Sequence, residues 1–124
     1  MKTLFIVGGN GDIGKAIREK FVENSYQVIA PPKEAFCLRD SQGLLENPLI
    51  EAIDPDVFIH CAGINFPTPF DSIAPQDFEE TLSVNAKSFF YLMQKLLPRM
   101  KEKGGNVIAI SSLYGAISRK NRLA

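Results

Sequence analysis

Three glycines near the amino terminus are spaced as in a loop that binds phosphate. Gly8, Gly11 and Gly14 follow the apolar run Thr3–Val7, and apolar residues then recur at helical spacing. Between a strand and a helix, backbone N–H groups and the positive end of the helix dipole can hold a pyrophosphate. The first glycine then makes the tight turn, the second lets the backbone approach the ligand, and the third lets the helix pack against the strand. We therefore predict a dinucleotide-binding loop, with contacts from Gly8, Asn10, Gly11, Asp12, Ile13 and Gly14.

Two alternative interpretations of these glycines remain open. Their spacing is Gly-x-x-Gly-x-x-Gly rather than the commoner Gly-x-Gly-x-x-Gly, and a loop of this kind can serve backbone geometry alone. Residues Gly9 to Lys15 also fit the start of a nucleoside triphosphate loop, Gly-x-x-x-x-Gly-Lys. That motif needs a Ser or Thr hydroxyl for Mg²⁺ at the next position, where this chain has Ala16. We therefore favour the dinucleotide.

The elements that would position this loop alternate between strand and helix. Short apolar runs predict strands at 3–7, 26–30, 35–38, 57–60 and 106–110, and helical patterns lie at 12–24, 40–53, from Pro75, and along 78–100. Nearly continuous apolar strands that alternate with helices are typical of a doubly wound, Rossmann-like parallel sheet with helices on both faces. We expect five strands in the order 3-2-1-4-5, which form a single domain over residues 1–124.

Other candidate contacts follow the predicted strands. Ligands bind such sheets beyond the carboxyl ends of the strands, where Ala62-Gly63 and Ser111-Ser112 also lie. The end of the second strand lies beside the adenosine ribose, where a basic side chain accepts a 2′-phosphate. The first charged residue there is Lys33, and Glu34 follows at once, so the sequence favours NADP(H) only slightly over NAD(H). Leu38, which ends the third predicted strand, completes the expected cofactor contacts.

Composition excludes several other classes of protein. The 124 residues include 14 basic and 14 acidic side chains with no long run of one sign, so neither nucleic acid nor a membrane surface is an expected partner. No leader or membrane-spanning stretch is apparent, and we expect a cytoplasmic protein with Cys37 and Cys61 reduced. His60 is the only histidine, so we predict a hydrogen-bonding core residue and no metal site.

Four short motifs then occur in one order along the chain. They are the glycine loop, His60-Cys61-Ala62-Gly63, Ser83-Val84-Asn85, and Ile110-Ser111-Ser112 with Gly115. Together they resemble the short-chain dehydrogenase/reductase family over essentially the whole chain. The glycine spacing is similar to that of the extended and atypical branches, and Ala62-Gly63 match the end of the family's Asn-Asn-Ala-Gly.

The resemblance implies hydride transfer between a nicotinamide and a carbonyl or alcohol carbon. Ser112 would orient the substrate carbonyl, and Asn85 would hold a water in the proton relay. The family's catalytic Tyr, with a Lys four residues later, lies about a dozen residues beyond that Ser, where this sequence stops at Ala124. Tyr114 has Ser118 at that spacing and is too close to the strand end to replace it. We therefore expect this chain to be inactive alone.

Two functions remain open from the sequence. The first is an NAD(P)-dependent oxidoreductase represented by its cofactor-binding part, which would use a small carbonyl or alcohol substrate only when the missing part is supplied. The second is a non-catalytic fragment that binds a dinucleotide or self-associates. The apolar strand Val107–Ile110 would form an unpaired edge, so we predict a homo-oligomer.

Overall fold

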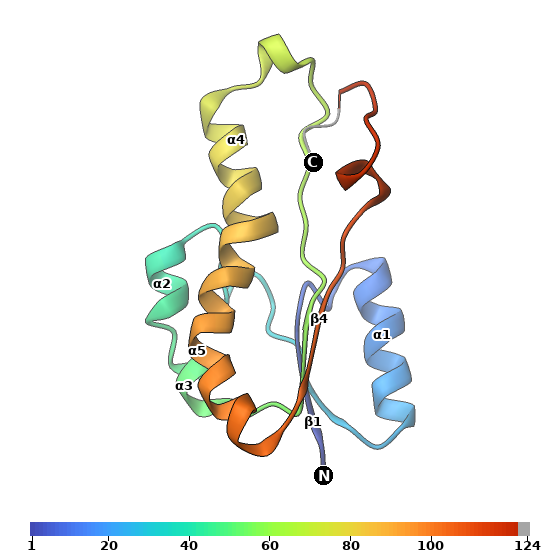
Figure 1. The fold of residues 1–124 in the computed structure, drawn as a ribbon, viewed down its shortest axis with the longest axis vertical. Coiled ribbons are helices and arrows are strands. Elements are labelled where there is room, and N and C mark those ends of the chain that lie inside the picture. Colours follow the sequence, from blue (N-terminus) through green and yellow to red (C-terminus); the bar gives the residue numbers. More distant parts are fainter. Residues whose placement is uncertain (122–124) are drawn as a thin grey trace.

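A parallel sheet of four strands forms the centre of the computed structural model, which describes residues 1–121 (Figure 1). The sheet has the order β2-β1-β3-β4, with β1 at Thr3–Val7, β2 at Gln27–Ile29, β3 at Val57–His60 and β4 at Asn106–Ala109. Val7 pairs with His60, and His60 pairs with Ala109. The carboxyl ends of β1, β3 and β4 therefore meet at one edge of the sheet, which is where the sequence predicts that a ligand binds.

Helices cover both faces of this sheet. They are α1 at Asp12–Glu23, α2 at Ser41–Leu45, α3 at Pro48–Ala52, α4 at Pro75–Leu82 and α5 at Ser88–Lys103, with a π-helix at Ser83–Lys87 between the last two and 3-10 turns at Phe70–Ser72 and Leu113–Gly115. In Figure 1, α1 lies on one side of the strands, and α2, α3 and α5 lie on the other. The predicted doubly wound architecture is confirmed.

Side-chain alternation along the central strands produces two hydrophobic cores. Leu4 and Ile6 of β1 pack with Val57 and Ile59 under α1. Phe5 and Val7 point the other way and join Phe58 and the α5 residues Leu92, Leu96 and Met100. Because β1 and β3 are covered on both faces, all four residues of β3 are buried, which explains its uninterrupted apolar sequence.

The predicted third strand, Ala35–Leu38, is not a strand, so the sheet has four strands instead of five. Pro31 and Pro32 cannot donate backbone hydrogen bonds to a neighbouring strand. The Ala35 and Phe36 N–H groups both donate to Pro32 O, which closes a turn. Phe36 is buried and meets Phe5 edge-on, with ring centroids 5.8 Å apart. Burial of this ring directs the segment across the sheet face and away from its edge.

The helix predicted over 40–53 is also divided. Pro48 interrupts it, because a proline N–H is missing and the residue before proline avoids helical geometry. Asn47 instead accepts a hydrogen bond from Leu49 N–H at 3.0 Å and starts α3. The helix start at Pro75 and the stop at Gly104, where φ is 79°, are as predicted.

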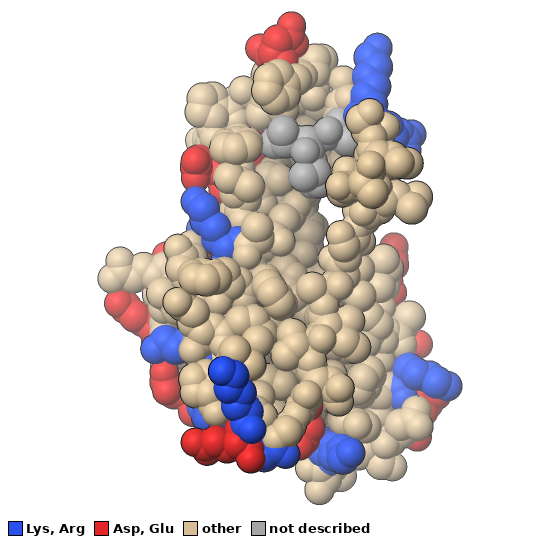
Figure 2. All heavy atoms as spheres, viewed as in Figure 1, with Lys and Arg blue, Asp and Glu red and all other residues tan. Residues whose placement is uncertain are grey.

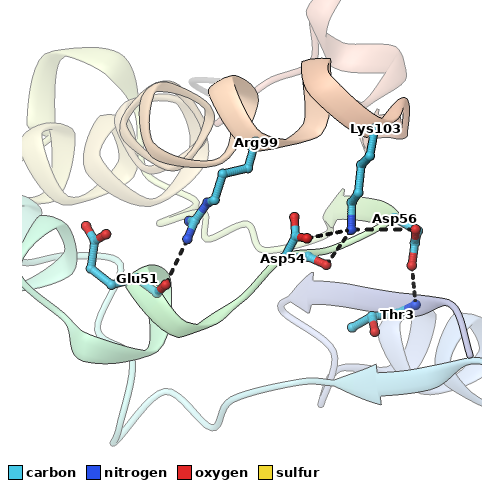
Figure 3. Close-up of polar contacts among 6 residues, drawn as sticks. All are labelled: Thr3, Glu51, Asp54, Asp56, Arg99 and Lys103. Atoms are coloured by element: carbon cyan, nitrogen blue, oxygen red, sulfur yellow. Dashed lines mark hydrogen bonds and ion pairs between the residues drawn. The ribbon is translucent and has the colours of Figure 1, made fainter.

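Polar contacts fasten the carboxyl end of α5 to the opposite end of the sheet from the site (Figure 3). The Arg99 guanidinium donates to Ile50 O and Glu51 O, the terminal carbonyls of α3, at 2.6 and 2.8 Å. Lys103 Nζ lies 3.1 Å from Asp54 Oδ2 and 3.6 Å from Asp56 Oδ1. These contacts hold α5 across the sheet and so fix the position of its amino-terminal end, next to the site.

Asp56 joins this network to β1, and its removal should destabilise the fold. Thr3 N–H donates to Asp56 Oδ2 at 2.7 Å, and this bond, with Lys103, holds the pKa of the carboxyl below its usual range. We expect Asp56→Ala to lower the free energy of unfolding by about 1 kcal/mol in urea titrations. The difference from the native protein should shrink as the pH falls through the lowered pKa, where the carboxylate becomes protonated. Exposed Asp71 provides the control, and an equal loss in Asp71→Ala would contradict this role of Asp56.

Candidate functional site

A cavity of about 670 Å³ lies at the carboxyl end of the sheet. It is lined by the glycine loop, the turn after β2 and the segment after β3, namely Val7, Gly8, Gly9, Asn10, Gly11, Pro31, Lys33, Glu34, Phe36, Cys37, Leu38, Arg39, Ala62, Gly63 and Ile64, with Val84 from the π-helix. Its volume falls within the range of small-molecule and cofactor sites in proteins. Segments far apart in the sequence therefore build one cavity, because parallel strands bring their carboxyl ends together.

Close backbone packing explains two of the three glycines. Gly8 has φ of 76°, and a Cβ there would lie 2.5 Å from Ala62 N. A Cβ on Gly14 would collide with the carbonyl oxygen of Gly8. The loop therefore packs directly against the segment after β3 and against the first turn of α1, and side chains at these positions would push the three apart.

The remaining loop geometry suits a phosphate. Gly11 caps α1 without a side-chain hydrogen bond, so the first amides of the helix have no side-chain cap. A Cβ on Gly11 would have only Gly8 O within 4 Å, at 3.8 Å, and one on Gly63 only Asn85 Oδ1, at 3.7 Å. Both glycines thus leave open space where they line the cavity. Helix amides without a side-chain cap, a helix dipole and room for close approach are the features that hold a pyrophosphate, so the residues present fit a dinucleotide.

Arg18 supports the loop from α1, and the sequence did not reveal this role. Its Nη1 donates to Asn10 Oδ1 at 2.7 Å and to Gly9 O at 3.2 Å. The arginine therefore holds the tip of the loop in one conformation. An arginine in the second turn of a helix has no distinctive spacing, so only the folded geometry identifies it.

The turn after β2 carries charges of both signs at the rim of the cavity. Lys33, Glu34 and Arg39 all line it, and Arg39 Nε lies 3.5 Å from Glu80 Oε2 of α4. Leu38 also lines it, although the strand that was expected to place this residue does not form. The net positive charge of these three lining residues is a suitable environment for a phosphate. Among the described residues, Arg39 shares its charge with Glu80, whereas Lys33 forms no ion pair at that rim.

Asn85 lies behind the cavity in the π-helix. Its Oδ1 accepts from Ile64 N–H at 2.8 Å, and its Nδ2 donates to Ile64 O at 2.9 Å. One side chain thus satisfies both backbone groups of a residue in the irregular segment after β3. Asn85 does not line the cavity itself, but it holds the segment that does.

His60 is buried at the carboxyl end of β3, where it is 2% exposed. Its Nε2 lies 2.7 Å from Ser88 Oγ, and the ring meets Phe89 edge-on. Burial lowers the pKa of His60 below its usual range, because a charged imidazole would lose its hydration. The prediction of a hydrogen-bonded core histidine agrees with these contacts.

This neutral histidine should make stability depend on pH. As the pH falls below about 6.5, the unfolded chain takes up a proton that folded His60 resists, so the free energy of unfolding should decrease, by at most about 1.4 kcal/mol per pH unit. The loss should continue down to the lowered pKa of the folded state. Urea titrations between about pH 7.5 and 5.5 measure it. Because the chain has one histidine, His60→Gln should remove the slope in this range, and a slope that survives contradicts the assignment.

Ser112 follows β4 at the same edge of the sheet. Its Oγ accepts from Tyr114 N–H at 3.2 Å and caps the turn Leu113–Gly115. The side chain is exposed and does not line the cavity. The Tyr114 hydroxyl accepts from Arg119 at 2.6 Å, so an arginine lies beside the tyrosine.

Tyr91 and Lys95 on α5 also have the four-residue Tyr/Lys spacing. Lys95 Nζ pairs with Glu51 of α3 at 3.4 Å, and the Tyr91 ring packs against Phe90. Neither residue lines the cavity. This pair therefore belongs to the packing of α5.

The cavity brings together many of the predicted cofactor contacts, though not all of them. Gly8, Asn10, Gly11, Lys33, Leu38, Ala62 and Gly63 line it. Asp12, Ile13 and Gly14 are outside the lining, and Ile13 is 60% exposed on α1. The roles of all these residues stay predictions. Among residues 1–121, no group of three His, Cys, Asp or Glu side chains could hold a metal ion. None of the helices described has the length and apolar character needed to cross a membrane.

Comparisons with known proteins agree with this geometry. The family model described as short chain dehydrogenase matches residues 50–124. L-fucose dehydrogenase of Mus musculus is 28% identical over 143 residues, which cover 98% of this chain and 52% of that protein. NADP-dependent 3-hydroxy acid dehydrogenase YdfG of Salmonella typhi is 26% identical over 138 residues, which cover 91% of this chain and 55% of that protein.

Solved structures show the same fold. 4-Hydroxyisoleucine dehydrogenase complexed with NADH superposes with a TM-score of 0.87 at 27% identity, over 98% of this chain and 60% of that one. ElxO with NADP bound gives a TM-score of 0.83 at 21% identity, over 97% of this chain and 59% of that one, which supports the fold alone. The chain spans about half the length of the curated relatives it matches.

Proposed function

The chain belongs to the short chain dehydrogenase family, and on that premise we propose that residues 1–124 form the dinucleotide-binding domain of an NAD(P)-dependent oxidoreductase. When bound, the nicotinamide supplies or accepts the hydride exchanged with a carbonyl or alcohol carbon. The observation that carries the proposal is the cavity in which the glycine loop and the segment Ala62–Ile64 face each other at the carboxyl end of the sheet.

The chain's own residues would bind and orient the nucleotide. The amides at the start of α1, which have no side-chain cap, would donate hydrogen bonds to the pyrophosphate, and Gly11 and Gly63 would leave room for it. Lys33 contributes positive charge at the rim where the ribose would lie, which favours a 2′-phosphate and thus NADP(H). Phe36 and Leu38 provide apolar surface in the same cavity.

Residues 1–124 would supply only part of the catalytic machinery. Ser112 is exposed at the sheet edge, where its hydroxyl can donate to a substrate carbonyl, and Asn85 would hold the water of the proton relay. Tyr114 bonds to Arg119, and Tyr91 lies outside the cavity. We therefore propose that these residues alone bind the nucleotide without turnover, and that a small carbonyl or alcohol substrate requires the acid and pocket of a longer protein.

Nucleotide titration tests this proposal directly. NADPH and NADH fluorescence should change saturably as protein is added, and the protein contributes no tryptophan background because the chain has none. A shift in the melting temperature with either nucleotide gives an independent readout. If neither nucleotide binds saturably, the proposed cofactor site is wrong.

A second candidate function, self-association, rests on β4. This strand is the last in the sheet order, and Val107, Ile108 and Ile110 are 37%, 44% and 41% exposed. Figure 2 shows uncharged side chains across the centre of this face, where Figure 1 places β4, with basic side chains over α5 and further charged side chains around the periphery. An apolar strand with a free edge is a template for pairing with another chain.

We therefore expect residues 1–124 to form homo-oligomers. Gel filtration with light scattering should give a mass that rises with protein concentration, and Ile108→Lys should shift it towards the monomer. The control is Val22→Lys, because Val22 is also exposed but lies on α1, away from β4. A monomer at all concentrations would remove this candidate.

A further inference from the structure

The π-helix Ser83–Lys87 has a structural cause in the residues beside it. The Ser88 N–H bonds to Ser83 O, five residues back. In a regular α-helix it would reach Val84 O, four residues back. Here the Ser88 hydroxyl donates to Val84 O at 2.7 Å, in place of that amide. The Ser88 hydroxyl thus supplies the hydrogen bond to Val84 O that the Ser88 amide does not make in the wider turn.

His60 completes this arrangement from the sheet. A hydroxyl has one proton, and Ser88 gives it to Val84 O, so Ser88 Oγ must accept from His60 Nε2 at 2.7 Å. His60 therefore carries its proton on Nε2. Both side chains are buried, with His60 2% and Ser88 1% exposed, so water cannot readily replace either partner.

The same turn holds the other end of the cavity wall. Asn85 follows Val84 directly, and its amide makes both hydrogen bonds with the backbone of Ile64. The chain around segment 61–64 is therefore held at two points, by the bond of His60 to Ser88 directly after the π-helix and by the bonds of Ile64 to Asn85 within it. Three residues of this segment, Ala62, Gly63 and Ile64, line the cavity.

We propose that His60 is a positioning residue for the nucleotide: through Ser88 it stabilises the π-helix, and through Asn85 it fixes the segment Ala62–Ile64 against the glycine loop. His60 lies outside the cavity lining and acts only through these neighbours. The proposal rests on the proposed dinucleotide site. In this proposal the Nε2–H of His60, rather than the size or charge of its ring, holds the segment Ala62–Ile64 in the position where it lines the cavity.

Four variants separate positioning from general stability. His60→Phe keeps a ring against Phe89 and removes the N–H, whereas His60→Gln keeps an N–H donor for Ser88. Ser88→Ala removes the link from the other side. Thr81→Val is the matched control, because the buried Thr81 hydroxyl makes the same kind of bond, to Asp77 O at 2.7 Å, one helix earlier.

Three quantities are measured in each variant: the Kd for NADPH and NADH, the hydrogen-exchange rate of the Ile64 amide by NMR, and the unfolding free energy. We expect His60→Phe and Ser88→Ala each to raise Kd about tenfold, which corresponds to about 1.4 kcal/mol. Ile64 exchange should accelerate by a similar factor. The double variant should be no worse than either single one, since both break the same chain of contacts.

His60→Gln should stay close to the native protein in Kd and Ile64 exchange, and Thr81→Val should lower stability alone. The proposal is overturned if His60→Phe and Ser88→Ala have the same Kd and the same Ile64 exchange rate as the control Thr81→Val. His60 would then have only a structural role. If the native protein binds no nucleotide, the proposed function fails. Ile64 exchange then still decides whether His60 positions the segment.

Discussion

Gly8→Ala should lose nucleotide binding and about 3 kcal/mol of stability, because two costs add at this residue. The φ of 76° places an alanine in the left-handed region, which costs about 1–2 kcal/mol. The new Cβ would also lie 2.5 Å from Ala62 N, so the loop and the segment after β3 must separate. Overpacking of this kind costs about 1–3 kcal/mol. Urea unfolding and nucleotide titration, done where circular dichroism shows an intact fold, measure both effects.

Gly104 offers a control with a similar positive φ and no close neighbour. Its φ is 79°, and a Cβ there would have nothing within 4 Å. Gly104→Ala should therefore cost only the conformational part, about 1–2 kcal/mol, and leave Kd unchanged. The difference between the two variants isolates the contact of Gly8 with Ala62. Equal losses in both would show that the glycine loop needs its conformation and not the close packing.

The central part of the fold was predictable because its sequence patterns are local. Val57–His60 is apolar throughout and is buried on both faces, and the predicted bounds agree with β3. The run Ala35–Leu38 has a similar apolar composition but forms a turn, in which the Phe36 ring packs edge-on against Phe5. Apolar content indicates burial, but it does not distinguish a buried strand from a turn with one buried ring. That choice depends on tertiary contacts.

The lining of the cavity was predictable to the same degree. The glycine loop is predictable from its spacing, and Ala62-Gly63 from its place at the carboxyl end of a predicted strand, because close backbone approach needs glycine or a small residue. Arg18 and Arg39 were not found. The role of Arg18 depends on a hydrogen bond from α1 back to Asn10 in the glycine loop. Arg39 lines the cavity from the irregular segment where the third strand was predicted to end. A long side chain that contacts a different segment of the folded chain has no characteristic spacing in the sequence, so the sequence does not identify it.

Lys33→Glu should change which nucleotide binds, and this is the second large effect we expect. Lys33 lines the cavity where the turn after β2 would face the ribose. A hydrogen bond between a lysine and a phosphate contributes about 1.5–3 kcal/mol. The variant should therefore bind NADPH at least about tenfold more weakly, whereas NADH, which has no 2′-phosphate, should bind within about twofold of the native protein. Fluorescence titration with both nucleotides measures the ratio.

Two further variants decide whether the charge acts locally. Lys101→Glu makes the same charge change in the last turn of α5 and should leave the ratio unchanged, because a distant exposed charge is screened. Glu34→Gln removes the acidic neighbour of Lys33 in the cavity and should strengthen NADPH binding. If Lys33→Glu weakens both nucleotides equally, Lys33 acts on a group that they share, such as the pyrophosphate. If it weakens neither, Arg39 is the remaining cation on this rim, and release of its ion pair with Glu80 would have to accompany binding.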